Sequence, residues 1–428
     1  MSTLIPEISK ASFDDAGGLR LPERQAKEVN ESFKQYTAVF GGITVRLKSL
    51  SYAEWEETPQ EWCLEKLTFG PRMLIVGKNT AGKSRAIRVT ASLARSLIGA
   101  QAPTVSGTYK AVFDFNGKDY EYELTCKNAE VIHEKISASG KILLNRELGG
   151  VGRIWAAKIG DGQHIDFQVP PSTLAAVARR DQIQHGFIEP LFEWANSLRF
   201  YQFNGQHQNM LNMLSSMEQQ VDERNENAVV AIFKEGVARF GSAFTESLIA
   251  DLASIDYQIE KIELSEPITI RFASGGPPVI GLKVKERALK GVTDQFGMST
   301  GMYRVVALLI HVTFAQFKGA ASSVLIDDIG EGLDFDRSLR LIELLRAKAE
   351  KYNFQLVMTT NDKFVMNHVP LEEWTVLHRT GHIVHVSNHE NSKTAFDEFK
   401  FTGLSNFSFF EINADQMNFE GIGEGENA

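Results

Sequence analysis

The stretch Ile75-Val-Gly-Lys-Asn-Thr-Ala-Gly-Lys-Ser-Arg85 contains the pattern G-x-x-x-x-G-K-S from Gly77 to Ser84. Glycine-rich loops of this kind turn backbone N–H groups inward around a phosphate, and the helix that follows adds its positive N-terminal end. Lys83 can then reach the β- and γ-phosphates, and the Ser84 hydroxyl can hold Mg²⁺. The pattern predicts a phosphate cradle made of Gly77, Lys78, Asn79, Thr80, Ala81, Gly82, Lys83, Ser84 and Arg85.

The residues on either side of this loop have the patterns of a strand and a helix. Residues 71–76 form a short apolar run that is typical of a buried strand, and residues 84–97 carry apolar side chains at helical spacing. A strand, a glycine-rich loop and a helix in this order form the P-loop unit. The sequence therefore predicts an α/β fold of the P-loop type. The loop alone fits kinases, GTPases and ATPases alike.

The composition of the 428 residues is that of a soluble globular protein, with 43% hydrophobic and 23% charged residues. No apolar run is long enough to span a bilayer, and the first residues have neither the basic region nor the apolar core of a signal peptide. The two cysteines, Cys63 and Cys126, cannot form a disulfide framework. We therefore expect a cytoplasmic protein without a membrane partner.

The charge of the chain bears on nucleic-acid binding. The formal net charge is −9, which argues against a protein that coats nucleic acid by bulk charge. A local basic groove is still compatible with this value, because the field depends on where the charges lie. Nucleic acid therefore stays open as a class of partner.

Outside the loop, β-type and helical stretches alternate. Residues 36–50 alternate like a β-hairpin whose turn would be Gly41-Gly42, and several strand-like runs lie between residues 105 and 169. We expect helical stretches over residues 172–196 and 208–254. Strands are expected over residues 198–203, 257–272 and 279–286. Heptads are not sustained in the second helical stretch, which argues against a long coiled coil.

Two carboxylates follow another apolar strand far beyond the loop, in Ser322-Ser-Val-Leu-Ile-Asp-Asp328. A carboxylate at the end of a strand beside the P-loop can hold Mg²⁺ through water, and we assign that role to Asp327. Asp328 lies where a base could polarise an attacking water. A strand that runs into an ordinary acidic turn would look similar, but Gly330-Glu-Gly-Leu-Asp334 follows directly and favours the site.

A second anion site is suggested upstream, where Met298-Ser-Thr-Gly-Met-Tyr-Arg304 leads into an apolar helix. A hydroxyl and free N–H groups at a helix N-terminus can bind an anion. Arg304 would project from the first turns of this helix. An ordinary helix cap by Ser299 or Thr300 explains the same residues.

Taken in order, these pieces resemble the ABC-type ATPases of the RecF and SMC class, and more closely the compact relatives grouped with the overcoming-lysogenisation-defect (OLD) ATPases. The matching segments are Gly77–Ser84, Met298–Arg304, Ile326–Asp328, Gly332–Asp334 and Thr360–Asp362. The resemblance covers roughly residues 38 to 380. It implies a two-lobed ATPase head with a β-rich antiparallel subdomain and a helical insertion.

The resemblance also implies ATP and Mg²⁺ as cofactors and a head that dimerises around ATP. The P-loop of one copy would face the Ser-x-Gly signature of the other, so that Ser299 and Gly301 contact the γ-phosphate in trans with support from Arg304. ATP would then join two copies into a homodimer or a larger assembly, and hydrolysis would loosen it. The resemblance therefore implies a molecular switch rather than a metabolic enzyme.

Several residues depart from the family pattern. Thr300 replaces the glycine that many relatives carry between Ser299 and Gly301, and it fits if its side chain faces outward. Asp328 stands where most members have glutamate, which is one methylene longer, and Glu331 is an alternative carboxylate. The position of the family's switch histidine falls on Asn361, which can hydrogen-bond a phosphate but carries no charge. We therefore expect slow hydrolysis.

Two further groups of residues bear on metal binding. The family has a glutamine that reaches Mg²⁺ from the loop after a central strand, and Gln202 and Gln206 are both candidates for it. His382 and His385 would face opposite sides of a strand, which argues against a shared metal with His389.

We expect no nuclease domain in the residues that follow Asp362. The residues after Thr360–Asp362 are too few for the Toprim-type nuclease that OLD nucleases carry, so an effector nuclease would be a separate polypeptide. The dense phenylalanines of residues 396–410 fit packing on the head and partner binding equally well.

The resulting division has five parts. They are a lead-in (1–36), the first part of the head with the P-loop (37–104), a β-rich and helical insertion (105–290), the second part of the head (291–390), and an extension with a disordered tail (391–428). Compact ATPases of this kind are often the sensing or regulatory subunit of bacterial anti-phage systems, paired with a nuclease or toxin. The alternatives are a RecF-like DNA-repair or chromosome-maintenance ATPase and a non-hydrolysing scaffold that binds ATP as a structural ligand.

Overall fold

The computed structural model describes residues 45–159, 162–203, 221–270, 279–319, 323–400, 402 and 404–411, together with the backbone of three two-residue strands. The chain forms two compact units, Met1–Thr44 and Val45–Ala428. In the first unit, β1 (Ser12–Phe13) pairs with β2 (Leu19–Arg20) in antiparallel fashion. Most of the expected lead-in and the expected disordered tail lie outside the described residues.

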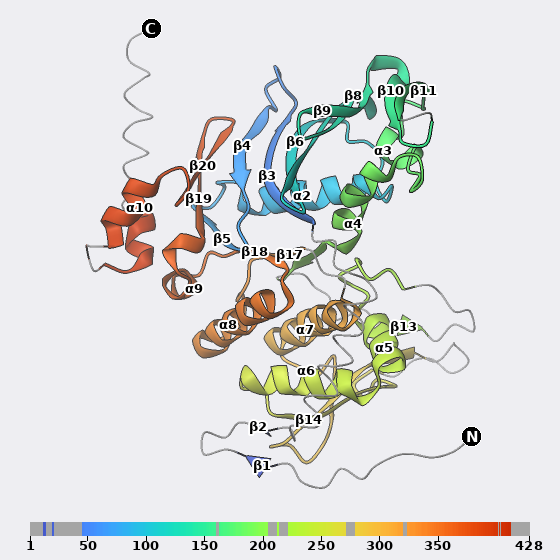
Figure 1. Ribbon diagram of the computed structural model, residues 1–428. Helices are drawn as coiled ribbons and strands as arrows, with labels where there is room; N and C mark the ends of the chain where they lie inside the picture. The colour runs from blue at the N-terminus through green and yellow to red at the C-terminus, as the bar shows by residue number, and fades with distance from the viewer. Residues whose placement is uncertain are drawn as a thin grey trace, which may run out of the picture. The chain divides into compact units, whose positions relative to one another are not determined.

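A large mixed sheet organises the second unit (Figure 1). Five neighbouring strands at one edge are parallel, and the eight strands at the other edge form an antiparallel series. From the antiparallel edge to the parallel edge, the order is β11 (Gln163–Gln168), β10 (Val151–Ala156), β9 (Lys141–Arg146), β8 (Glu130–Ala138), β7 (Lys118–Lys127), β6 (Ser106–Phe115), β3 (Val45–Glu54), β4 (Trp62–Thr68), β20 (Ile383–Asn388), β19 (Trp374–Thr380), β5 (Arg72–Gly77), β18 (Gln355–Thr359), β17 (Ser323–Asp327) and β12 (Arg199–Gln202). The fold is mixed α/β, as predicted.

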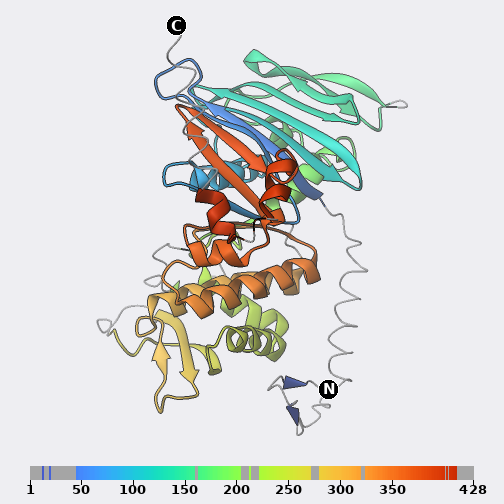
Figure 2. The same ribbon diagram turned by 90° about the vertical axis from the view of Figure 1, so that its left-hand side faces the viewer.

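Hydrophobic cores cover both faces of the parallel strands, because alternate side chains point to opposite faces. In β5, Leu74 and Val76 belong to one core, whereas Met73 and Ile75 belong to the other. The first core packs on α5 (Val229–Phe240), α6 (Ser242–Ser254), α7 (Thr300–Lys318) and α8 (Phe335–Tyr352), and the second on α2 (Lys83–Leu97) and α4 (Glu189–Ser197). Figures 1 and 2 show these two groups of helices on opposite sides of the strands.

The remaining elements are small. A second sheet has the order β13 (Asn212–Met213), β15 (Val279–Glu286) and β14 (Ile259–Ser265), and β16 (Thr293–Asp294) pairs with β15. The described residues also include the short helices α3 (Ala175–Ala178), α9 (Lys363–His368) and α10 (Lys393–Lys400) and the 3-10 turns Leu148–Gly150, Gly186–Ile188 and Leu371–Glu373. No helix in the described ranges is long and apolar enough to cross a membrane.

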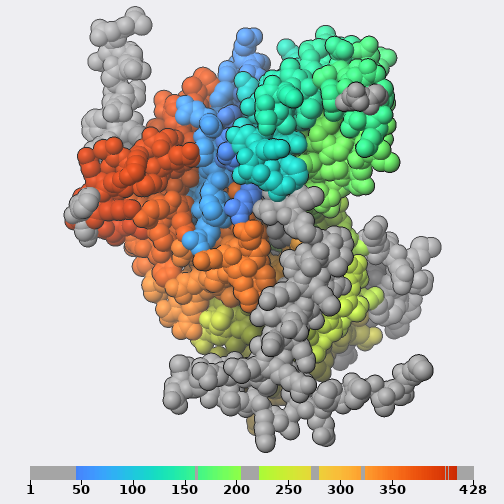
Figure 3. Space-filling view, in the orientation of Figure 1, coloured from blue at the N-terminus to red at the C-terminus, as the bar shows by residue number. Residues whose placement is uncertain are grey.

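The structure describes residues 45–50 of the hairpin expected over residues 36–50, and it gives this strand different partners. β3 continues to Glu54 and pairs with β4 and β6, while the Gly41-Gly42 turn lies outside the described residues. The sequence did not predict β4, because an irregularity in the β3–β4 register breaks the strict alternation of buried and exposed side chains. Figure 3 shows the β3–β4 region in blue, between the orange C-terminal strands and the cyan to green antiparallel strands.

Both expected helical stretches are interrupted. Residues 179–185 form turns between α3 and α4, and residues 221–228 precede α5 without forming a helix. In the second case Asp222 and Asn225 each accept a hydrogen bond from the backbone N–H two residues later, which competes with helix formation. Similarly, β14 ends at Ser265, two residues before Pro267, rather than continuing to residue 272.

The phenylalanines near the C-terminus pack on the head. Phe396 and Phe399 of α10 are buried, as is Phe409, and all three belong to the core that also contains α7 and α8. Phe407 and Phe410 are partly buried against the same core. Of the two expectations for this segment, packing on the head is the one that the structure bears out.

A buried ion pair joins the antiparallel strands to the segment that follows them. Glu134 of β8 and Arg146 of β9 are register partners, both are 0% exposed, and Arg146 Nη1 lies 3.5 Å from Glu134 Oε2. Arg146 donates hydrogen bonds to two carbonyls within residues 170–173, at 2.6 and 2.9 Å. Glu134 accepts two from backbone N–H groups at the start of α3, at 2.6 and 2.9 Å. Nothing in the sequence pattern pointed to this pair.

Candidate nucleotide-binding site

The glycine-rich loop begins where β5 ends, between the parallel strands β18 and β19. A side chain at Gly77 would place its Cβ 2.7 Å from the Leu377 carbonyl oxygen, so only glycine fits between the two strands. Gly82 has φ of +102° and faces Trp62, whose Cζ2 would lie 3.2 Å from an added Cβ. The tight packing around both glycines gives the loop a defined shape, while Lys78, Asn79 and Thr80 are exposed and Ala81 is buried.

Lys83 is held over this loop by the loop itself. Its Nζ donates hydrogen bonds to the carbonyl oxygens of Gly77, at 2.7 Å, and Lys78, at 3.3 Å. The residue is only 6% exposed. Burial lowers the pKa of Lys83, and the negative charges of Asp328 and Asp327 oppose that shift. The two carboxylates therefore lie within electrostatic reach of the loop lysine.

Arg85, which the sequence placed in the phosphate cradle, contacts the neighbouring strands. Its guanidinium forms an ion pair with Glu54 of β3 and lies 4.3 Å from the ring centroid of Trp62 in β4. These contacts fix the start of α2 against the sheet, next to the partly buried Ser84. The cradle role of Arg85 stays a prediction.

Asp327 ends β17 and is almost fully buried, with 1% exposure. Its Oδ1 accepts a hydrogen bond of 2.7 Å from the Thr359 hydroxyl, and its Oδ2 lies 3.8 Å from a guanidinium nitrogen of Arg88 in α2. The Thr359 hydroxyl in turn accepts a hydrogen bond of 2.8 Å from the backbone N–H of Asp328. One threonine thus orients the side chain of the first carboxylate and the backbone of the second.

On the prediction that Asp327 holds Mg²⁺ for ATP hydrolysis, Thr359→Val should raise the Mg²⁺ concentration needed for half-maximal hydrolysis by about 10- to 100-fold, because outer hydrogen bonds orient metal-binding carboxylates. Valine keeps the shape of threonine, so a magnesium titration of the hydrolysis rate isolates the lost hydroxyl. Thr360→Val is the matched control, since that hydroxyl donates to the Ile329 carbonyl instead. Equal magnesium requirements in both variants would contradict the positioning role.

Asp328 and Asn361, the predicted base and the position of the switch residue, lie together. Asn361 Nδ2 donates a 3.2 Å hydrogen bond to Asp328 Oδ1. Asp328 has φ of +55°, a left-handed conformation that aspartate tolerates better than most residues. Burial raises the pKa of Asp328, and the charges of Asp327 and Glu331 raise it further. Glu331 itself is exposed on the loop that follows.

Of the two candidate glutamines, only Gln202 lies among the described residues. It ends β12 and is the register partner of Asp327 in the adjacent parallel strand, so their backbones are neighbours. Its backbone N–H donates a 2.6 Å hydrogen bond to Glu226. Gln206 lies outside the described residues, and the assignment of either glutamine to Mg²⁺ stays a prediction.

The Ser-x-Gly turn begins α7. The Ser299 hydroxyl accepts a 3.2 Å hydrogen bond from the N–H of Met302, so Ser299 is the helix cap, and both Ser299 and Thr300 are exposed. Gly301 lies against the loop after the carboxylates, where an added Cβ would be 2.6 Å from the Gly332 carbonyl oxygen. Arg304 Nη1 donates a 2.9 Å hydrogen bond to the Glu331 carbonyl. The signature therefore rests on the carboxylate loop of its own chain.

Sequence reasoning missed three contributors to this site. Thr359 directly precedes the matching segment Thr360–Asp362 but was given no role, although a hydroxyl next to that segment was a usable signal. Arg88 carries no pattern that distinguishes it from other exposed helix residues. Trp62 belongs to β4, which was not recognised, and so its contact with the glycine-rich loop was invisible.

Comparisons with known proteins find similar folds at low sequence identity and assign no residue. No family model matches the chain, and no curated protein matches it. Solved structures with a similar fold include an Smc head bound to the C-terminal winged-helix domain of ScpA, which is 13% identical, with a TM-score of 0.48 over 80% of this chain and 96% of that one. The Smc head with an extended coiled coil bound to the C-terminal domain of ScpA, from Pyrococcus furiosus, is 12% identical, with a TM-score of 0.47 over 83% of this chain and 100% of that one. The SMC head domain from Thermotoga maritima is 14% identical, with a TM-score of 0.40 over 80% and 98%.

Proposed function

We propose that the protein is a Mg²⁺-dependent ATP hydrolase that works as an ATP-driven dimerisation switch. The observation that carries the proposal is the convergence of a glycine-rich loop, its lysine and two carboxylates at the ends of the parallel strands β5 and β17. The charges of Asp328 and Asp327 oppose the lowering of the Lys83 pKa by burial, although more than two hundred residues separate them from Lys83 in sequence. Phosphoryl transfer from ATP needs this combination of an anion cradle and metal-binding carboxylates.

Each residue has a distinct task in this proposal. The loop N–H groups and Lys83 bind the phosphates, and Ser84 and Asp327, with Gln202 beside them, hold Mg²⁺, which neutralises charge on the phosphates when bound. Asp328 orients and polarises the attacking water, and Asn361 holds its carboxylate at 3.2 Å. Aspartate is shorter than the usual glutamate, so hydrolysis should be slow.

A second copy would complete the site. Ser299 is exposed at the N-terminus of the long helix α7, where a hydroxyl and the positive helix end favour an anion. Gly301 and Arg304 link this turn to the loop after Asp328 in the same chain. Binding of a γ-phosphate to the Ser299 turn of the partner could therefore shift the loop that follows the partner's carboxylates. Such a coupling suits a switch.

The proposal predicts that ATP with Mg²⁺ doubles the solution mass of the wild-type protein and leaves the mass of Lys83→Ala and Ser299→Ala unchanged. Lys83→Ala weakens nucleotide binding, whereas Ser299→Ala removes the contact to the partner's nucleotide. Light scattering measures the mass directly. Loss of the helix cap in Ser299→Ala is expected to cost about 1 kcal/mol of stability, so thermal unfolding curves should accompany the measurement. A Ser299→Ala protein that dimerises like the wild type would contradict the contact between Ser299 of one copy and the nucleotide of the other.

The resemblance to OLD-type ATPases supports a role as the sensing or regulatory subunit of an anti-phage system, with a nuclease or toxin as a separate effector. Co-purification of the product of a neighbouring gene in an ATP-dependent manner is the test. Two outcomes would redirect the proposal. ATP-dependent duplex binding with a steep salt dependence favours a RecF-like role, and absence of any turnover favours an ATP-bound scaffold.

A further inference from the structure

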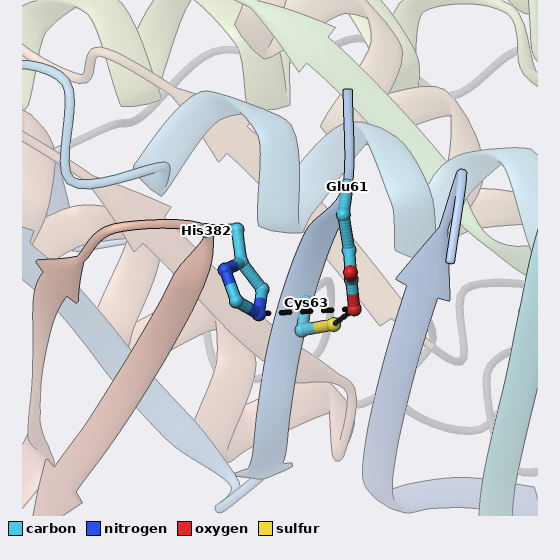
Figure 4. A group of neighbouring side chains, drawn as sticks. All are labelled: Glu61, Cys63 and His382. Carbon is cyan, nitrogen blue, oxygen red and sulfur yellow. Dashed lines mark hydrogen bonds and ion pairs between the residues drawn. The ribbon is translucent and has the colours of Figure 1, made fainter. Parts of the chain in front are cut away.

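Three side chains with metal-binding atoms meet at the amino end of β4. Glu61, Cys63 and His382 come from the start of this strand and from the turn between β19 and β20 (Figure 4). Their ligand atoms all lie within 4.8 Å of one another. Backbone pairing holds the two segments in register, because the Cys63 N–H donates a 2.9 Å hydrogen bond to the His382 carbonyl. We propose that these residues bind one zinc ion.

Two of the three distances between ligand atoms fit a tetrahedral ion, and all three are within 4.8 Å. Glu61 Oε1 lies 3.7 Å from His382 Nε2 and 3.5 Å from Cys63 Sγ. Zinc bonds of about 2.0 to 2.3 Å place neighbouring tetrahedral ligands roughly 3.3 to 3.8 Å apart. The donor set also suits zinc, since it combines a thiolate, an imidazole and a carboxylate. Three protein ligands leave the fourth position for water or another ligand.

Without a cation, a proton links two of the three ligand atoms. The Cys63 thiol donates a 3.5 Å hydrogen bond to Glu61 Oε1. Zinc binding replaces the proton, because the metal ligand is the thiolate. Access is open, since the His382 side chain is 50% exposed and that of Glu61 is 26% exposed.

The site is built next to the nucleotide loop but on the other face of the strand. Trp62, between the two ligands in sequence, turns toward the loop, and its Cζ2 lies 3.2 Å from a Cβ placed on Gly82. Val384, just after the ligand turn, makes a similar approach at 3.3 Å. Zinc would therefore cross-link β4 and β20, whose residues Trp62 and Val384 pack against Gly82 of the glycine-rich loop.

The test is a titration of metal-free, full-length protein with Co²⁺, which takes the place of zinc and gives a thiolate-to-cobalt charge-transfer band in the near ultraviolet. We expect one Co²⁺ per chain, displaced by Zn²⁺, in the absence of nucleotide. Cys63→Ser should abolish the band, and His382→Ala should weaken binding at least about tenfold, as loss of a metal's partners does. The magnesium site contains no cysteine, so it cannot produce this signal.

Two matched controls are available, one in β20 and one in β7. His385→Ala removes the next histidine in sequence, whose Nδ1 lies 2.9 Å from Glu65 Oε1, outside the proposed ligand set, and the band should persist. Cys126→Ser removes the other free thiol and should also leave it unchanged. Absence of the band in the wild-type protein, or its survival in Cys63→Ser, would overturn the proposal. Circular dichroism of each variant checks that the fold is intact.

Discussion

Replacing Asp328 with asparagine should lower the ATP hydrolysis rate by about 10²- to 10⁴-fold while leaving ATP binding and dimer formation in place. Asparagine has the size of aspartate and keeps an oxygen for the 3.2 Å hydrogen bond from Asn361, so the local geometry should persist. It cannot take up a proton from the attacking water. The bound nucleotide should then hold the dimer closed for longer, which phosphate release and light scattering measured over time would both report.

Two carboxylate variants make this experiment specific. Glu331→Gln changes the exposed alternative base on the following loop, and Asp336→Asn removes an exposed charge in the first turn of α8. We expect both to hydrolyse ATP at rates close to that of the wild type. A large loss in Glu331→Gln with normal turnover in Asp328→Asn would transfer the role of base to Glu331. Normal turnover in all three would remove both residues from the chemistry.

The parts of the site that sequence reasoning located are those encoded within a few residues. The glycine-rich loop, the strand that precedes it and the helix that follows it lie in one stretch, and their pattern reflects backbone demands at Gly77 and Gly82. The same holds for the strand that ends at Asp327, with Asp328 directly after it, and for the cap at Ser299. Each of these features depends on residues that are neighbours in the chain, so the amino-acid pattern alone is enough to locate it.

The parts that sequence reasoning missed are contacts between distant segments. Thr359 reaches Asp327 only because β18 lies beside β17, and Cys63 meets His382 only because β4 pairs with β20. A strand order in which β4 and β20 are neighbours cannot be derived from alternation within either strand. The five-part division of the chain likewise stays a prediction, although the structure shows residues 105–168 continuing the main sheet.

The second large effect concerns stability. Arg146→Met should lower the free energy of unfolding by about 3 to 5 kcal/mol. Methionine fills the volume of the arginine stem but supplies no charge, so the carboxylate of Glu134 stays buried at 0% exposure without its counterion. The carbonyls within residues 170–173 also lose their donor. Urea unfolding of the intact protein measures the change, with the antiparallel strands expected to open first.

The size of the effect should depend on burial rather than on charge as such. Arg153→Met breaks an ion pair with Asp166 whose side chains are 69% and 90% exposed, and it should cost under about 1 kcal/mol. Adding Glu134→Gln to Arg146→Met removes the stranded charge, while an amide oxygen can still accept from the N-terminus of α3. The double variant should therefore recover part of the loss, because the penalty arises mainly from an unpaired buried charge. If Arg146→Met cost no more than Arg153→Met, the pair would not anchor this segment, and apolar packing beneath α3 would have to hold it instead.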